Sequence, residues 1–104
     1  MNSQKNKSIL VGDIGSTKSS WYLSGIDHRH ISLPGFNPVV HGAETGEQII
    51  DTLADQIRNE HPAEIWYYGT GVVDVRTADV VRHLLSKGFP SSNLHVSTDL
   101  EGAA

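Results

Sequence analysis

The sequence has 104 residues, of which 38% are apolar and 19% are charged, with a formal net charge of −4 and no cysteine. This length fits one domain with a modest core, and the lack of cysteine excludes disulfides, thiolate zinc sites and cysteine nucleophiles. The missing basic block argues against a nucleic-acid partner, and no apolar run is long enough to span a membrane. We therefore expect a cytoplasmic protein with a disordered N-terminus over residues 1–7.

The first predicted strand, residues 8–12, leads into a turn rich in groups that bind phosphate and metal ions. The turn contains one carboxylate, two glycines, two hydroxyls and one ammonium group: Asp13, Gly12, Gly15, Ser16, Thr17 and Lys18. Glycine backbone, hydroxyls and an ammonium favour bound phosphate, whereas Asp13 needs Mg²⁺ or its water between itself and the phosphates. A P-loop is excluded because Thr17 stands where that motif has glycine. An ordinary hairpin turn into a second strand, residues 19–24, is the alternative.

The middle of the chain is predicted to complete an antiparallel meander and then form a helix. A short third strand is predicted over residues 30–33, and a loop with two prolines and a glycine follows it. Asn37 in that loop has the local pattern of a turn residue, and its amide offers a donor and an acceptor. Apolar residues at helical spacing predict a helix that begins at a capping box, Thr45-x-x-Gln48, and runs to about Asn59.

The second half of the chain alternates strands and helices. A fourth strand is predicted over residues 65–68, a second helix over 77–87 with Gly88 as its C′ residue, and a fifth strand over 94–98. A helix between two strands implies a crossover onto a parallel neighbour. The segment 69–71 is either a simple strand-to-helix turn or part of a site, because open α/β sheets bind ligands at the carboxyl ends of strands.

Four segments together resemble the superfamily of sugar kinases, actin and heat-shock chaperone ATPases. Asp13-Ile-Gly-Ser-Thr-Lys18 is similar to its first phosphate motif, D-x-G-x-T-K. Three more follow in the family's order: Gly35-Phe-Asn37, Gly69-Thr-Gly71 and Thr98-Asp99-Leu-Glu-Gly102-Ala103. The most similar branch is that of N-acetylglucosamine kinase-like proteins, which is grouped with the activator ATPases of benzoyl-CoA reductase. By local pattern alone, Asp99 is a helix N-cap followed by good helix formers.

The resemblance implies an α/β, ribonuclease H-like domain. Its five-stranded mixed sheet would have the order 3-2-1-4-5, with helices between strands 3 and 4 and between strands 4 and 5. It also implies ATP and Mg²⁺ as cofactors and an amino sugar such as N-acetylglucosamine as the substrate. We therefore expect an ATP-dependent sugar kinase with neither nucleic acid nor membrane as its partner.

The same resemblance assigns a role to each matching residue. Asp13 would hold Mg²⁺, directly or through water, and Asn37 and Gly71 would position the sugar. Asp99 would contact the sugar and act as the catalytic base. The ATP phosphates would be bound by residues of the turn: Gly15, Ser16, Thr17 and Lys18.

The family's enzymes contain two such domains, and residues 8–104 match only the first. We therefore expect an N-terminal ATPase domain truncated at the start of its last helix, without its second domain and with little activity of its own. The apolar face that the missing half leaves exposed would favour a homodimer. Two alternatives remain open: an ATPase activator of a redox enzyme, of the benzoyl-CoA reductase activator type, and a non-catalytic sugar sensor.

Overall fold

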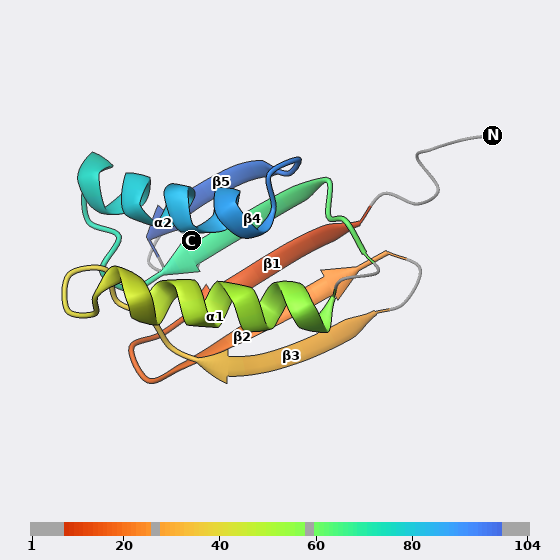
Figure 1. The fold of residues 1–104 in the computed structure, drawn as a ribbon, viewed down its shortest axis with the longest axis horizontal. Coiled ribbons are helices and arrows are strands. Elements are labelled where there is room, and N and C mark those ends of the chain that lie inside the picture. The colour runs from red at the N-terminus through yellow and green to blue at the C-terminus, as the bar shows by residue number, and fades with distance from the viewer. Residues whose placement is uncertain (1–7, 26–27, 58–59, 99–104) are drawn as a thin grey trace.

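The computed structural model describes residues 8–25, 28–57 and 60–98, which form a five-stranded sheet with two helices on one face (Figure 1). The elements in chain order are β1 (Ile9–Ile14), β2 (Lys18–Ser24), β3 (Arg29–Pro34), α1 (Ala43–Gln56), β4 (Glu64–Gly69), α2 (Val75–Gly88) and β5 (Asn93–Thr98). The predicted α/β class is confirmed. No helix in these described ranges is long and apolar enough to cross a bilayer.

β1 lies at the centre of the sheet, and the order of the strands is β3-β2-β1-β4-β5. β2 runs antiparallel to β1 and β3, whereas β4 runs parallel to β1 and β5. The helices supply the crossovers that parallel pairing requires, α1 between β3 and β4 and α2 between β4 and β5. The predicted mixed sheet and its ribonuclease H-like topology are therefore confirmed, and the carboxyl ends of β1, β4 and β5 share one edge.

The core lies between the sheet and the two helices, because alternate strand residues point to that side. Trp21 is 1% exposed and meets the ring of Tyr67 edge-on, with 5.9 Å between the ring centroids. The other fully or nearly fully buried strand residues include Leu10, Ile14, Leu23 and Ile65. The helices contribute the apolar stripes predicted from their periodicity: Ile49, Ile50 and Leu53 from α1, and Ala78, Val81, Leu84 and Leu85 from α2.

The opposite face of the sheet carries a row of side chains, one from each strand. In register across the sheet the row consists of His30, Tyr22, Val11, Trp66 and His95. Its two ends are stacked pairs: the Tyr22 and His30 rings lie 4.8 Å apart, and the Trp66 and His95 rings 3.8 Å apart. Both helices lie on the other side of the sheet, so neither covers this row (Figure 1).

The predicted start of α1 is wrong. The helix begins at Ala43, after a glycine with extended backbone angles and no side-chain cap, so Thr45 lies inside the first turn. The cause is the preceding loop, in which the Asn37 carbonyl accepts hydrogen bonds from two backbone N–H groups, at 2.8 and 3.0 Å. This turn directs the chain into the helix before the capping-box sequence is reached. The helix ends at Gln56, and its predicted end, Asn59, lies outside the described residues.

Two further boundary predictions are corrected. Gly88 is the last residue of α2 rather than its C′ residue, because the buried Phe89 serves as the C-cap and no left-handed residue follows the helix. β1 continues to Ile14, so Gly12 and Asp13 belong to the strand and not to the turn. The turn is therefore shorter than predicted, and Asp13 is held by strand pairing on both sides.

Candidate functional site

The carboxyl ends of β1, β4 and β5 meet at one edge of the sheet. The strand register pairs Ile14 with Gly69, and Gly69 with Thr98. The last residues of the three strands, Ile14, Gly69 and Thr98, are therefore level with one another at this edge. Asp13 lies one residue before it in β1. Asp99, the predicted catalytic base, lies outside the described residues.

The turn between β1 and β2 presents polar groups at this edge. The Gly15 N–H donates to the Lys18 carbonyl (2.9 Å) and closes the turn. The side chains of Ser16, Thr17 and Lys18 are exposed and make no hydrogen bond or ion pair within the described part of the chain. Two hydroxyls and an ammonium beside a tight backbone turn are donors that suit a phosphate.

Asp13 points to the side of the sheet away from the helices, because Gly12 and Ile14 on either side of it are buried beneath them. Its carboxylate is exposed and has no partner among the described residues. Those residues also contain no group of three His, Cys, Asp or Glu side chains that could hold a metal. A single free carboxylate beside a turn whose free donors suit a phosphate still fits Mg²⁺, which is often held by one or two carboxylates, water and substrate phosphates.

Asn37 is fixed by hydrogen bonds on three of its polar groups. Its Oδ1 accepts from the Val39 N–H (2.9 Å), and its own backbone N–H donates to Nδ1 of His41 (2.9 Å). Its carbonyl accepts from two backbone N–H groups later in the loop. His41 therefore uses Nδ1 as an acceptor, which places the proton of its neutral ring on Nε2. Of the donor and acceptor that the Asn37 side chain offers, only the Nδ2 donor is unpaired within the described residues.

Gly71 packs against Asn37 in a conformation that needs glycine. Its φ is 80°, the only positive φ in the described chain, and a Cβ here would overlap Asn37 Oδ1 and lie 2.9 Å from Pro38 Cδ. The neighbouring Thr70 N–H donates to the Ile14 carbonyl (3.0 Å). The loop after β4 is therefore bound both to the end of β1 and to the loop that carries Asn37.

Gly35 packs directly against the turn, which sequence reasoning did not predict. A Cβ at Gly35 would overlap the Gly15 carbonyl oxygen and lie 2.6 Å from the Lys18 backbone nitrogen. The next residue, Phe36, donates its N–H to the same Gly15 carbonyl (3.0 Å). In the sequence, only the glycine directly after β3 hints at this contact. It lies beside the turn because the end of β3 pairs with the start of β2. The contact joins segments that are distant in sequence, so no local pattern reveals it.

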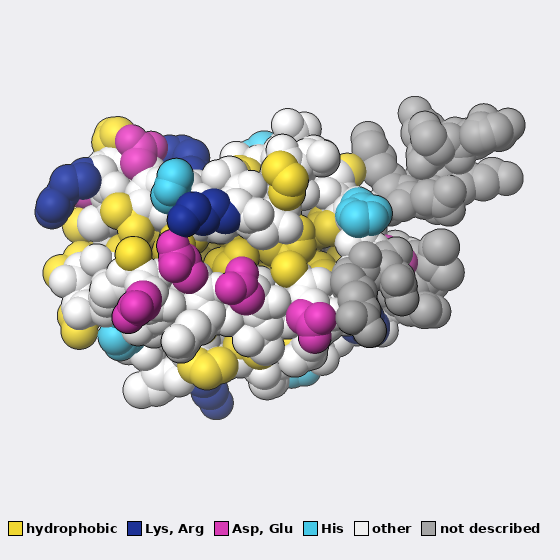
Figure 2. Space-filling model, viewed as in Figure 1, with side chains coloured by type: hydrophobic (Ala, Val, Ile, Leu, Met, Phe, Trp, Pro, Cys, Tyr) yellow, Lys and Arg dark blue, Asp and Glu magenta, His cyan; other side chains and the backbone are white. Residues whose placement is uncertain are grey.

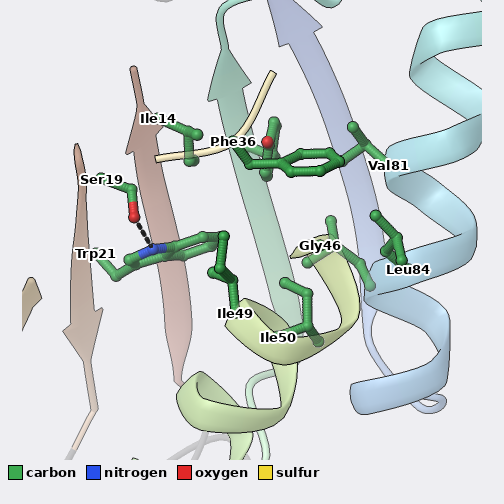
Figure 3. A pocket seen from close by; sticks show the side chains of 11 residues that line it. Ile14, Ser19, Trp21, Phe36, Gly46, Ile49, Ile50, Val81 and Leu84 are labelled. Atoms are coloured by element: carbon green, nitrogen blue, oxygen red, sulfur yellow. Dashed lines mark hydrogen bonds between the residues drawn. The ribbon is translucent and has the colours of Figure 1, made fainter. Parts of the chain in front are cut away.

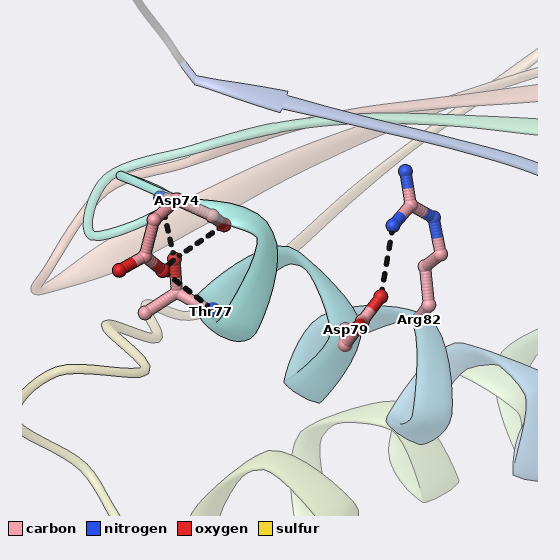
Figure 4. Close-up of polar contacts among 4 residues, drawn as sticks. All are labelled: Asp74, Thr77, Asp79 and Arg82. Atoms are coloured by element: carbon pink, nitrogen blue, oxygen red, sulfur yellow. Dashed lines mark hydrogen bonds and ion pairs between the residues drawn. The ribbon is translucent and has the colours of Figure 1, made fainter.

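The N-terminus of α2 is occupied by its own capping box (Figure 4). The Asp74 carboxylate accepts from the Thr77 N–H (2.9 Å), and Thr77 Oγ1 accepts from the Asp74 N–H (3.1 Å). Hydrogen bonds from the Thr77 backbone and hydroxyl lower the pKa of Asp74. The predicted helix start at Thr77 is wrong by two residues, because the helix begins at Val75 after an Asp74 cap whose third helical residue is threonine instead of the usual Glu or Gln. An exposed ion pair, Asp79 with Arg82 at 3.1 Å, follows in the same helix (Figure 4).

A small cavity lies in the core, where Phe36 reaches in from the loop toward Val81 of α2 (Figure 3). Its volume is about 10 Å³, close to the minimum for one water molecule. The lining is apolar except for Ser19 and Tyr67. This space is far too small for a sugar or a nucleotide, so the core cavity is not a site for either.

Exposed valines flank the edge. Val39 and Val40 precede α1, Val73 and Val75 lie at the start of α2, and all four side chains are 62% to 75% exposed. Figure 2 shows apolar side chains at the end of the molecule where these two loops lie in Figure 1. Free polar groups beside apolar side chains suit a ligand that has both polar and apolar parts.

No family model and no curated protein matches this chain. Among the solved structures that share its fold are two from different organisms. One is a Porphyromonas gingivalis protein proposed to be an N-acetylglucosamine kinase, with a TM-score of 0.77 and 21% identity, over 88% of this chain and 34% of that one. The other is a glucokinase from Balamuthia mandrillaris in complex with glucose, with a TM-score of 0.57 and 19% identity, over 92% of this chain and 30% of that one. The chain thus spans about a third of the length of the structures it matches.

Proposed function

We propose that this domain belongs to an ATP-dependent sugar kinase and holds the phosphates of ATP and the acceptor sugar, an amino sugar such as N-acetylglucosamine. The main support is the meeting at one sheet edge of a free carboxylate, a turn with unpaired donors and an unpaired amide donor. A fold shared with a glucokinase and with a protein proposed to be an N-acetylglucosamine kinase agrees with this proposal. The fold alone would not suffice, since one fold hosts many activities.

In this proposal the turn and Asp13 handle the phosphates. Gly15 lets the backbone approach them, and Ser16, Thr17 and Lys18 donate hydrogen bonds to them. Asp13 holds Mg²⁺, directly or through water, and the bound ion neutralises phosphate charge. Most of the rate enhancement would come from positioning and charge neutralisation rather than from covalent chemistry.

The acceptor sugar is assigned to the two loops beside the turn. Asn37 donates from Nδ2 to a sugar oxygen, and Gly71 positions that amide, because only a glycine can pack this closely against Asn37. The exposed valines of these loops contact the apolar parts of the sugar, including an acetyl methyl group. Asp99, which follows the last described residue of β5, accepts the hydroxyl proton as the hydroxyl oxygen attacks the γ-phosphorus.

A binding experiment on the chain tests the phosphate assignment. We expect MgATP to shift the amide NMR resonances of Gly15 to Lys18, and N-acetylglucosamine to shift those of Asn37 and Gly71. Asp13→Asn should weaken the binding of MgATP but not that of metal-free ATP, because the substitution removes a negative charge beside the phosphates. Asp51→Asn, which changes an exposed carboxylate on α1, is the control. Shifts confined to other parts of the chain would refute the assigned site.

A turnover experiment tests the reaction. Since the chain spans about a third of the matched structures, we expect sugar phosphorylation only from a protein that includes the remainder. In that protein Asp99→Asn should abolish sugar-dependent ATP consumption while preserving sugar binding. Full turnover by the variant would rule out Asp99 as the base. ATP hydrolysis that does not depend on any sugar would instead favour an ATPase activator of a redox enzyme.

A further inference from the structure

The contact between Gly35 and the turn joins two parts of the proposed site that bind different ligands. We propose that Gly35 is a positioning residue that makes the phosphate turn (Gly15–Lys18) and the acceptor loop (Gly35–His41) one mechanical unit. A ligand bound to the acceptor loop then changes the conformation of the phosphate turn, and the reverse. This inference rests on the proposed function, which supplies the two ligands.

The first step is the direct backbone contact. There is no room for a methyl group on the Cα of Gly35, because it would overlap the Gly15 carbonyl oxygen. The same methyl group would also lie close to the Ser16 carbonyl carbon and the Lys18 nitrogen. The Phe36 N–H donates to the Gly15 carbonyl at 3.0 Å. Because backbone atoms have few ways to yield, a displacement of the turn must displace the start of the acceptor loop.

The second step is the anchor beyond this contact. Phe36 is 4% exposed, and its ring lies in the core cavity between α1 and α2 (Figure 3). A Cβ on Gly46 of α1 would lie 3.1 Å from that ring, so the packing there is tight. The Phe36 ring therefore acts as a pivot that stays in place. When the backbone shifts on the side of the turn, the backbone on the other side, at Asn37, shifts with it.

The third step is the orientation of the Asn37 amide. Its backbone N–H is held by His41 at 2.9 Å, its Oδ1 by the Val39 N–H at 2.9 Å, and its side chain packs against Gly71. The free Nδ2 donor therefore points in a direction set by the whole loop rather than by a single side-chain torsion. A shift that begins at Gly15 changes where this donor points, which links phosphate occupancy to sugar binding.

The test measures whether binding at one loop reaches the other. We titrate the ¹⁵N-labelled chain with N-acetylglucosamine and expect amide shifts both in the acceptor loop and at Gly15–Lys18. Gly35→Ala should move the resonances of both loops without ligand, and the sugar should then shift the acceptor loop but no longer the turn. Gly42→Ala is the matched control, because a Cβ there meets nothing within 4 Å, and it should behave as the wild type.

The outcomes separate this inference from the proposed function. Sugar-induced shifts confined to the acceptor loop of the wild type would overturn the coupling and leave the proposed function standing. Shifts that still reach the turn in Gly35→Ala would mean direct sugar contact, and would also overturn it. If neither N-acetylglucosamine nor MgATP shifts any resonance, both proposals fail together. If Gly35→Ala does not fold, a titration of the wild type with inorganic phosphate decides, because this ligand is too small to contact both loops. Shifts at Gly15–Lys18 that extend to Asn37 would support the coupling, and shifts confined to the turn would overturn it.

Discussion

The two tryptophans of the chain lie on opposite faces of the same sheet. Trp21 in β2 is buried beneath the helices, and its Nε1–H donates to Ser19 Oγ at 2.9 Å. Trp66 in β4 is only partly buried on the other face, where its ring stacks on His95 of the neighbouring strand. One tryptophan is enclosed by two layers of structure, whereas the other contacts mainly its neighbours within one layer.

The difference in burial between the two tryptophans indicates which face of the sheet contributes most to the stability of the fold and of the candidate site. The helix-covered face combines burial with paired polar groups such as Trp21 and Ser19, so we expect most of the free energy of unfolding to depend on it. The candidate site is attached to that face, through Phe36 and the buried residues that end β1. Substitutions on the uncovered face should therefore change stability little, and three pairs of matched variants and one single variant can test this expectation.

The largest difference should come from the tryptophans themselves. Trp21→Ala should lower the free energy of unfolding by about 3–5 kcal/mol, because it removes a buried ring and leaves a cavity. Trp66→Ala should cost only about 1 kcal/mol, from partial burial and one cross-strand stack. Urea denaturation followed by far-UV circular dichroism measures both values. Equal losses would show that the uncovered face contributes as much as the covered one.

A smaller difference should separate two neighbouring serines of β2. Ser19 Oγ accepts from Trp21 and donates to the Pro34 carbonyl at 2.9 Å, whereas Ser20 is on the uncovered face without a side-chain hydrogen bond in the described chain. Ser19→Ala should cost roughly 1–3 kcal/mol, because it leaves the buried indole N–H unpaired. Ser20→Ala should stay within about 0.5 kcal/mol of the wild type. The same denaturation experiment would contradict the comparison if the two variants were equally stable.

The strands and both helices could be predicted because their signals are local, whereas the order of the strands was implied by the resemblance of four motifs to a known superfamily. Alternation in residues 94–98 and helical spacing in α1 and α2 follow directly from which side chains the core buries. The ends of the helices were harder, since a capping-box pattern at Thr45 competes with a turn that begins at Asn37. That turn depends on hydrogen bonds along the loop, which the pattern of apolar residues does not encode.

The candidate site also has features that the sequence predicts and features that it does not. Strand ends predict that Asp13 and the glycines after β4 share an edge, and the register confirms that they do. The packing of Gly35 on the turn and the bond from Asn37 to His41 depend on the path of a loop, so the sequence does not reveal them. The roles of these residues in binding remain predictions until ligands are tested.

Two tyrosines give the third comparison. Here the substitution on the covered face should raise the free energy of unfolding instead of lowering it. Tyr67 Oη is buried and has no hydrogen-bond partner among the described residues, whereas Tyr22 is 50% exposed. Tyr67→Phe should raise the free energy of unfolding by about 1 kcal/mol, because an unpaired buried hydroxyl is costly. Tyr22→Phe should have no measurable effect. A loss of stability in Tyr67→Phe would show that the hydroxyl is bonded in solution.

The same pair predicts a pH dependence. Burial raises the pKa of Tyr67 above the value of about 10 that it has in the unfolded chain. The neutral hydroxyl is favoured in the folded state, so its contribution is complete below about pH 10 and is lost as the pH rises above it. The advantage of Tyr67→Phe over the wild type should therefore grow above about pH 10, and that of Tyr22→Phe should not.

The smallest effect should come from the polar contact at the edge of the uncovered face. Glu64 Oε1 and His95 Nε2 lie 3.0 Å apart, and both side chains are about one-third exposed. Solvent screens such a pair, so Glu64→Gln should cost less than about 0.5 kcal/mol, and added salt should reduce the difference further. Gln can still hydrogen-bond the imidazole, so the variant removes charge and keeps the contact. A loss as large as that of Ser19→Ala, measured by urea denaturation at low and high salt, would mean that this face is far better shielded from water than its exposure indicates.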